Sequence, residues 1–454
     1  MIFQYFHQGN ENLLLMNGNM ENKINKLRIA LVGDVLITHR ISFNKQLQEI
    51  NQFFKSHDCV IGNLETVIRK DEGFPEAFPG GGSCFCPPSC INDLKTLGFN
   101  IFSTGNNHSM DYGHGGLLAT IKYLDNNDIP HTGTGRNLAD AAKPAYYNSP
   151  AGRIALINVT SSFHDSYLAG PQNQDVVGRP GVAPLRHKAL YTIPHEDYIS
   201  LERIAKLSGI NSYHDQAIKE GYLKGSRYLK FGSFEFEEGE KYNVTTSPLE
   251  IDLKRTIDII QDAKLESDIV IMSIHSHQFL KEKQNSPLFI EVFARECIKA
   301  GADIVFCHGP HQLRGIEKLK NGIIFYGLGN FILQHEGMEY MPEEAYMKYG
   351  FSRNTIKGLQ HLFLERSQNG TKGLITLKEA WESIIVSIEI SNTNINVELH
   401  PINLMRNDVK GFTGLPYFSQ NRNILEYINE LSKKYMTEIS INKNNVGLIS
   451  INRK

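Results

Sequence analysis

The sequence has no long apolar run. Among its 454 residues, no stretch provides the roughly 18 consecutive apolar residues that a membrane-spanning helix needs. Residues 1–26 also lack the continuous apolar segment of a secretory signal, because their longest apolar run is Leu13 to Met16. We therefore expect no membrane span, a flexible N-terminal extension over residues 1–26, and a cytoplasmic protein.

The sequence also lacks an excess of either charge. Its 47 Lys and Arg residues nearly balance its 49 Asp and Glu residues, and no basic stripe is concentrated anywhere along the chain. Nucleic-acid binding normally requires such a basic surface, so we expect no nucleic-acid partner. The apolar and charged fractions, 41% and 21%, are those of an ordinary globular protein.

The six cysteines lack the spacing of a structural zinc site or a disulfide framework. Cys84, Cys86 and Cys90 lie close together in "GGGSCFCPPSC", but no second pair or suitably spaced His follows them. The other three cysteines lie singly in apolar segments and are most simply buried thiols. Without an export signal, disulfides are not expected either.

What the sequence does contain is a regular alternation of strands and helices from Leu27 onward. Short apolar strands such as "LRIALVGD", "CVIGNLET" and "FNIFSTGNN" alternate with helical stretches, and "AYYNSPAGRIALINVT" predicts a hairpin. The scheme resumes with "DIVIMSIHSH", "ADIVFCHGPH" and "GIIFYGLGNFIL". This alternation predicts an α/β fold with a largely parallel sheet covered on both faces.

The predicted domain organisation has four parts. A core domain comprises residues 27–160 and 249–335, and residues 161–248 form an insertion, which is a candidate lid or substrate-recognition segment. Residues 336–454 form a C-terminal extension that is rich in strands and contains helices. The flexible N-terminal segment is the fourth part.

Polar side chains that can bind a metal ion follow several of the predicted strands. They are Asp34, Asn63, Glu65, Asn107, His108, His275, His277, His308, His311 and Asn330. In open α/β sheets, ligands bind outside the carboxyl ends of the strands. Taken singly, Asp34 or Asn63 is more typical of a turn, but Glu65 in an apolar segment requires a cation or hydrogen-bond partners. Mixed oxygen and nitrogen donors favour one or two ions of Zn, Mn or Fe over Ca or Mg.

The order of the motifs resembles a known family. The motifs "GNLET", "GNNHSMDYG", "HSH", "GADIVFCHGPHQLRGIE" and "IIFYGLGNFI" are similar to those of the CapA-type capsule or poly-γ-glutamate synthesis family. That family is a branch of the calcineurin-like metallophosphoesterases. The resemblance covers Leu27 to about Ser161 and Pro248 to about Leu333, and it implies an α/β sandwich with an inserted segment and a C-terminal extension.

The resemblance implies a first metal ion bound by Asp34 and His311, with Glu65 in the place of the acid that bridges two ions. Members of the superfamily usually carry Asp-x-His in the first motif, and here Leu36 stands at the third residue. One ligand of the first ion is therefore missing, and His277 is the candidate to replace it. The bridging acid is Glu instead of Asp, which lengthens its reach.

The resemblance further implies a second ion bound by Asn107, His275 and His308. Asn63 and Asn330 are additional ligands or residues that hold the ligands in place.

His108 is expected to lie beside the substrate as an acid or charge stabiliser. Ser109 stands where the superfamily has an acid after Gly-Asn-His, and we expect Asp111 to take over the orientation of His108. His108 and Asp111 are therefore the candidate catalytic pair.

The insertion contains a group of basic residues in a segment punctuated by proline. Arg179, Arg186 and His187 are candidates for binding an anionic substrate, because guanidinium groups pair with carboxylates and phosphates. A solvated surface elaboration explains the same residues equally well.

Three functions fit these features. The first is a metal-dependent enzyme, a phosphoesterase-like hydrolase, that acts on an anionic polymer, peptide or phosphoester. The second is a metal-dependent peptide Cα epimerase, in which His108 and Asp111 move the proton. The third is a non-catalytic partner in a capsule-synthesis assembly. The sequence leaves a homo-oligomer open in each case.

Overall fold

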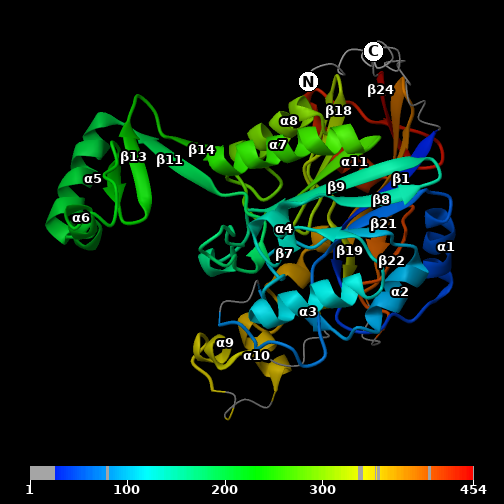
Figure 1. Ribbon diagram of the computed structural model, residues 1–454, viewed down its shortest axis with the longest axis horizontal. Coiled ribbons are helices and arrows are strands. Elements are labelled where there is room, and N and C mark those ends of the chain that lie inside the picture. Colours follow the sequence, from blue (N-terminus) through cyan, green and yellow to red (C-terminus); the bar gives the residue numbers. More distant parts are fainter. Residues whose placement is uncertain are drawn as a thin grey trace, which may run out of the picture.

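The computed structural model describes residues 26–77, 81–335, 341–352, 354, 358–406 and 411–452 (Figure 1). The extension predicted for residues 1–26 therefore lies outside the described residues, except for Lys26. In the described part of the chain, no helix is both long enough and apolar enough to cross a membrane. The body consists of two β-sheets packed on each other, with helices on their outer faces.

The first sheet contains the N-terminal strands. Its described strands run in the order β23-β24-β21-β20-β1-β2-β5-β6, and β19 and β22 pair with β1 and β21. As the strand–helix alternation predicts, β1, β2, β5 and β6 are parallel. The bounds are β1 (Leu27–Leu36), β2 (Cys59–Leu64), β5 (Ile101–Ser103), β6 (His131–Thr132), β19 (Asn330–Leu333), β20 (Glu382–Ile390), β21 (Asn394–Leu404), β22 (Pro416–Phe418), β23 (Ser440–Ile441) and β24 (Gly447–Asn452).

The second sheet contains the strands that follow in the sequence. Its described strands run in the order β17-β18-β16-β15-β9-β8. The hairpin predicted around Ser149 and Gly152 is confirmed as the antiparallel pair β8–β9. The bounds are β8 (Ala145–Ser149), β9 (Gly152–Thr160), β15 (Ile269–His275), β16 (Ile304–His308), β17 (Ile316–Leu319) and β18 (Gly322–Phe325).

The core has three apolar layers, and the alternation of side chains along each strand explains them. In β1, Ile29 and Leu31 face the interior between the sheets, whereas Ala30 and Val32 face the helices outside the first sheet. The side chains of β15 likewise alternate between the interior and the helices outside the second sheet. Because both faces of each sheet are covered, the sequences of these strands are continuous apolar runs.

Helices cover the two outer faces, as Figure 1 shows. Apolar residues of α1 and α2 pack on the first sheet, and those of α7 and α8 pack on the second. The first of these helices begins after Asn44, whose side chain accepts the backbone N–H of Leu47. The described helices of the body are α1 (Lys45–Phe54), α2 (Cys90–Leu97), α3 (Gly113–Asp125), α4 (Leu138–Ala142), α7 (Glu250–Glu266), α8 (Leu288–Ala300), α9 (Glu343–Met347), α10 (Leu359–Arg366) and α11 (Asn423–Ser432).

The described C-terminal strands complete the first sheet. The strand β20 pairs antiparallel with β1, with Leu27 opposite Ile390 and Leu31 opposite Val386. The strands β21 and β24 extend the sheet beyond β20. The segment predicted as a C-terminal extension therefore supplies part of the central core, including the fully buried Ile388.

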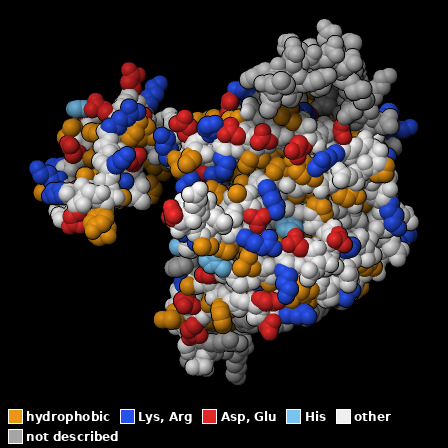
Figure 2. Space-filling model, in the orientation of Figure 1, with side chains coloured by type: hydrophobic (Ala, Val, Ile, Leu, Met, Phe, Trp, Pro, Cys, Tyr) orange, Lys and Arg blue, Asp and Glu red, His pale blue; other side chains and the backbone are white. Residues whose placement is uncertain are grey.

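Part of the predicted insertion forms a separate small unit that projects from the body (Figure 1). A four-stranded sheet in the order β12-β13-β11-β14 carries two helices, and Ala205 is the one buried side chain of these helices, which are described in full. Apolar side chains are visible on the surface of this unit in Figure 2, and Leu207, Tyr213 and Tyr222 are exposed. Its elements are β11 (His187–Ile193), α5 (His195–Ser208), α6 (Ser212–Lys219), β12 (Leu229–Phe231), β13 (Phe234–Glu238) and β14 (Asn243–Pro248).

The contribution of β20 to the core can be measured. Ile388→Ala is expected to lower the free energy of unfolding by about 2–5 kcal/mol, because it removes buried methyl groups and leaves a cavity. Leu448→Ala, in β24 with 37% of the side chain exposed, is the control and is expected to cost less than about 1 kcal/mol. Urea denaturation followed by circular dichroism measures both. Equal, small effects would contradict a structural role for β20.

Candidate metal centre

The candidate metal ligands meet where strands of the two sheets end. Asp34 lies near the carboxyl end of β1, and Glu65 directly follows β2, its parallel neighbour. His275 and His308 are the last residues of β15 and β16, and they are register partners in the second sheet. Parallel pairing brings together the two members of each pair, and packing of the two sheets brings the pairs together although they are more than 200 positions apart in the sequence.

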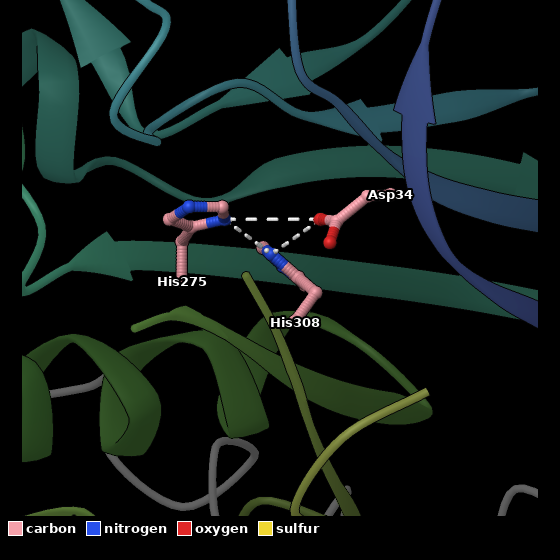
Figure 3. A group of neighbouring side chains, drawn as sticks. All are labelled: Asp34, His275 and His308. Carbon is pink, nitrogen blue, oxygen red and sulfur yellow. Dashed lines mark hydrogen bonds and ion pairs between the residues drawn. The ribbon is translucent and has the colours of Figure 1, made fainter. Parts of the chain in front are cut away.

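One group of donors is fully buried and contains Asp34, His275 and His308 (Figure 3). Asp34 Oδ1 lies 3.5 Å from His308 Nδ1 and 3.8 Å from His275 Nδ1. The two Nδ1 atoms are 2.9 Å apart. Ligands of a tetrahedral ion with bonds of about 2.1 Å are separated by roughly 3.4 Å, so these three atoms have the spacing of a shared ion.

A second group surrounds Glu65. Its Oε1 atom lies 3.7 Å from His275 Nε2, 3.9 Å from His311 Nε2 and 4.0 Å from His277 Nε2. Asn107 Oδ1 joins this group, 2.6 Å from His275 Nε2 and 3.2 Å from His277 Nε2. Oxygen and nitrogen donors thus converge from four separate segments of the chain.

The Glu65 carboxylate is the strongest sign that this group binds a cation. Both of its oxygens are buried, and neither has a hydrogen-bond partner among the described residues. An unpartnered buried carboxylate is costly, and native proteins normally pair such a group or bind it to a metal ion. The donor set of carboxylates, an amide oxygen and imidazoles therefore fits a divalent metal ion.

The loop between His308 and His311 links the two groups. His311 adopts a left-handed backbone conformation with a φ of 57°. Its Nδ1 lies 3.5 Å from Asp34 Oδ2, which also accepts the backbone N–H of Gly309 at 3.0 Å. Gly309 is required here, because it has a φ of 111° and a Cβ would lie only 3.1 Å from His275 Nε2. This loop is the reason that both of its histidines reach the same centre.

Asn63 and Asn330, predicted as additional ligands or as residues that hold the ligands in place, contact two of the candidate ligands. Asn63 Nδ2 donates to Asp34 Oδ1 at 2.9 Å. Asn330 Oδ1 accepts from His311 Nδ1 at 2.7 Å, and its Nδ2 donates to Ala380 O at 2.9 Å. Such contacts fix the orientation of metal ligands and are worth about 10–100-fold in affinity.

The pKa values in the centre are shifted in opposite directions. Burial raises the pKa of Asp34 to about 7, and burial together with the Asp34 charge raises that of Glu65 well above its usual value. Burial lowers the pKa of His308 to about 3 and that of His311 to about 4. Both kinds of group thus favour the neutral form, and a bound cation would favour ionised carboxylates beside neutral imidazoles.

The residue at the missing ligand position is part of the apolar core. Leu36 is 6% exposed, and it packs in the layer between the first sheet and its helices. It therefore offers the centre no donor. His277, predicted as its replacement, lies beside Glu65 and Asn107, so it is positioned as an additional ligand of that group.

His108 forms a buried pair with Asp111 at the edge of the centre. Its Nδ1 lies 2.7 Å from Asp111 Oδ2, which also accepts the backbone N–H of Cys84 at 2.8 Å. Burial alone would lower the pKa of His108, but the Asp111 charge outweighs it, and the pKa lies well above its usual value. Contact with Asp111 therefore favours the protonated form of His108.

Two other residues of this loop shape its backbone. Asn106 Nδ2 donates to Leu64 O at 2.8 Å, and Asn106 Oδ1 accepts the backbone N–H of His108 at 3.0 Å. Ser109, which replaces the usual acid, donates its hydroxyl to Thr104 O. These local contacts present Asn107 and His108 to the centre. The proximity of Cys84 to His108 and Asp111 was not predicted from the sequence, because it depends on tertiary structure.

The basic residues of the insertion have other contacts. Arg186 forms paired 2.9 Å hydrogen bonds with the buried carboxylate of Asp252. The ring of His187 stacks on Phe289 at a centroid distance of 4.0 Å. Arg179 Nε donates to Leu168 O at 3.0 Å. The assignment of these three residues to substrate binding remains a prediction, and for Arg186 the ion pair offers a structural role.

Two packed sheets with donor residues at the strand ends form the α/β sandwich of the calcineurin-like metallophosphoesterases, here with an inserted segment and a C-terminal extension. The family described as bacterial capsule synthesis protein PGA_cap matches residues 28–335. The chain belongs to this family.

Several known proteins are similar to this chain. Uncharacterized protein y4sH of Sinorhizobium fredii is 28% identical over 445 residues, which cover 95% of this chain and 94% of that protein. The capsule biosynthesis protein CapA of Bacillus anthracis is 24% identical over 72% of this chain and 65% of its own length. The PGA biosynthesis protein CapA of Bacillus subtilis is 23% identical over 72% and 68%. Haemophilus influenzae NAD nucleotidase superposes with a TM-score of only 0.30, which supports no inference.

Removal of the unpartnered carboxylate tests the metal centre. Glu65→Gln keeps the shape of the side chain but removes the charge that faces three imidazoles, so the affinity for Mn²⁺ or Zn²⁺ is expected to fall by about tenfold or more. Isothermal titration calorimetry measures this affinity, and Glu430→Gln, at an exposed position in α11, is the control. Unchanged affinity in the Glu65 variant would contradict the proposed ligand set.

The effect of pH on metal binding follows from Asp34. Burial raises the pKa of this carboxyl to about 7, so at lower pH an incoming ion must displace a proton. The increase in melting temperature produced by a fixed concentration of Mn²⁺ is therefore expected to grow as the pH rises from about 5 to about 8. Differential scanning calorimetry measures it, and an increase that is the same at each pH would contradict the prediction.

Proposed function

We propose that this protein is a metal-dependent hydrolase that acts on an anionic glutamate polymer in capsule or poly-γ-glutamate synthesis. Membership of the capsule synthesis family and the functions named for the two Bacillus relatives support the polymer. The observation that carries the enzymatic part is the Glu65 carboxylate, whose buried oxygens face three imidazoles without a hydrogen-bond partner among the described residues.

The proposed ligands form two sets, one around Asp34 and one around Glu65, and His275 belongs to both. Each set brings together carboxylate or amide oxygens with neutral imidazole nitrogens, which suits Zn, Mn or Fe. A divalent ion at this centre would supply Lewis acidity to a carbonyl or phosphoryl oxygen of the substrate. The proposed ligands are Asp34, Glu65, Asn107, His275, His277, His308 and His311.

His108 is the proposed proton donor to the leaving group. Its Nδ1 is held by Asp111 Oδ2, and the Cys84 side chain also interacts with the imidazole. We assign Nε2 to the substrate. The charge of His108 lowers the pKa of Asp34, Glu65 and His275, which supports a role for it next to the proposed ligands. General acid catalysis of this kind contributes about 10²–10⁴-fold to a rate.

Asp111 is proposed to position His108. The backbone N–H of Cys84 holds the same carboxylate oxygen that contacts the imidazole, so the carboxylate and the ring are fixed together. Asp111 thereby replaces the acid that is missing at Ser109.

The two other hypotheses predict different products. A peptide epimerase would exchange the Cα hydrogen with solvent and leave every bond of the chain intact, whereas a non-catalytic partner would change no substrate. The functions named for the relatives concern capsule and PGA synthesis, and they favour a polymer substrate over a small peptide.

The proposed activity is tested with a synthetic γ-linked glutamate decamer. The full chain with Mn²⁺ is expected to convert it into shorter products that mass spectrometry resolves, and His108→Ala is expected to lower the rate by about 10²–10⁴-fold with metal content unchanged. His114→Ala, at an exposed position of the same segment, is the control.

Three results would contradict the proposal. They are full activity after removal of metal by a chelator, full activity of the His108 variant, and deuterium uptake from solvent without cleavage, which would indicate the epimerase.

A further inference from the structure

A further group of metal-binding side chains contains a thiol. Cys84, His108 and Asp111 are buried, and each offers one donor atom, with all three atoms within 4.8 Å of one another. The other such groups in the described part of the chain contain only carboxylates and imidazoles. This group therefore differs in its chemistry from the centre around Asp34 and Glu65.

A short parallel strand pair holds the cysteine in place. The strand β3 (Val67–Ile68) pairs with β4 (Phe85–Cys86), and Val67 N donates to Cys84 O at 3.3 Å. On its other side, Cys84 N donates to Asp111 Oδ2 at 2.8 Å. The backbone of Cys84 is thus bonded both to the neighbouring strand and to the loop that carries the other two donors.

Arg69 clamps the same two segments together. Its side chain is buried, and its guanidinium carbon lies 4.2 Å from the ring centroid of Tyr112 and 5.2 Å from that of Phe85. The two ring centroids are 5.3 Å apart. Each cation–π contact of this kind contributes about 0.5–2 kcal/mol. Because Phe85 and Tyr112 are the chain neighbours of Cys84 and Asp111, the clamp holds the three donors together before any ion binds.

A thiolate, an imidazole and a carboxylate are the ligand types that Zn²⁺ binds in proteins. His108 Nδ1 and Asp111 Oδ2 are 2.7 Å apart, so a small side-chain movement opens the roughly 3.4 Å separation of two ligands on a tetrahedral ion. Soft thiolates select Zn²⁺ and similar ions, whereas Mn²⁺ favours oxygen ligands. No His follows Cys84 at the spacing of a zinc motif, and the fold supplies His108 from a separate loop.

We propose that Zn²⁺ or another thiophilic divalent ion binds to Cys84, His108 and Asp111 and inhibits the enzyme. Binding replaces the thiol proton and the proton of the imidazolium, both of which pass to solvent. A metal-bound His108 has no proton to give to a leaving group. The inhibition rests on the proposed function, whereas the metal site itself does not.

The site is tested by adding Cd²⁺ to the full chain saturated with Mn²⁺ and recording the ultraviolet spectrum. A Cd–thiolate bond produces a charge-transfer band that oxygen and nitrogen ligands do not produce. Cys84→Ser is expected to lose the band and to weaken Cd²⁺ binding by about tenfold or more, with Mn²⁺ affinity within about twofold. Cys86→Ser, at a buried position two residues away, is the matched control and is expected to keep the band.

A second variant keeps the thiol. His108→Ala is expected to weaken Cd²⁺ binding by about tenfold, and it carries the test if Cys84→Ser does not fold, which differential scanning calorimetry shows. The metal site is overturned if the unmodified protein gives no band, if Cys84→Ser keeps the band, or if Cys86→Ser loses it.

The inhibition is tested separately with the γ-linked glutamate decamer. In the Mn²⁺-loaded unmodified protein and in Cys86→Ser, Zn²⁺ is expected to lower the cleavage rate by about tenfold or more, and in Cys84→Ser the ratio of rates with and without Zn²⁺ is expected to stay near one. Equal ratios in all three proteins would overturn the inhibition. Absent cleavage with Mn²⁺ alone would contradict the hydrolase and the inhibition together, while the Cd²⁺ band still decides the metal site.

Discussion

The structure is built around the burial of two carboxyl groups and three imidazoles, those of His275, His308 and His311, where strands of the two sheets end. Asp34, Glu65, His275 and His308 are fully buried, so solvent cannot stabilise their charges. The shifted pKa values let the protein fold with these groups largely neutral. A cation reverses that balance, because it stabilises the ionised acids and uses the neutral rings as ligands. The same burial thus serves both folding and metal binding.

His275 lies between the Asp34 group and the Glu65 group, with one ring nitrogen facing each. Its Nδ1 faces Asp34 and His308, while its Nε2 lies 2.6 Å from Asn107 Oδ1, a separation typical of a donated hydrogen bond. A neutral imidazole has one nitrogen with a free lone pair. His275 would therefore bind the metal ion of only one group at a time, and its hydrogen-bonding partner would decide which one.

The sequence predicted the parts of this centre that follow from strand order. Asp34 lies near the end of β1, and His275 and His308 end β15 and β16, so their positions at strand ends follow from the alternation of strands and helices. The alternation predicted one sheet, whereas Asp34 and the two histidines lie in two sheets, and packing of these sheets brings them together. The contact of Asp111 with His108 was predicted from spacing within one loop. The contact of Cys84 with Asp111 was not predictable, because it joins segments whose relative position is set by loops. The pairing of β20 with β1 was missed for the same reason, since periodicity identifies a strand but not its partner.

The central place of β1 has a consequence for synthesis of the chain. This strand is made first, yet one of its edges is completed by β20, more than 350 residues later. Until the ribosome has released that segment, an apolar strand with unpaired backbone groups stays available to other chains. The first sheet is therefore completed only after β20 has been made, and truncation before β20 removes a partner of the strand that carries Asp34. Slow production or a chaperone is expected to raise the yield of soluble protein.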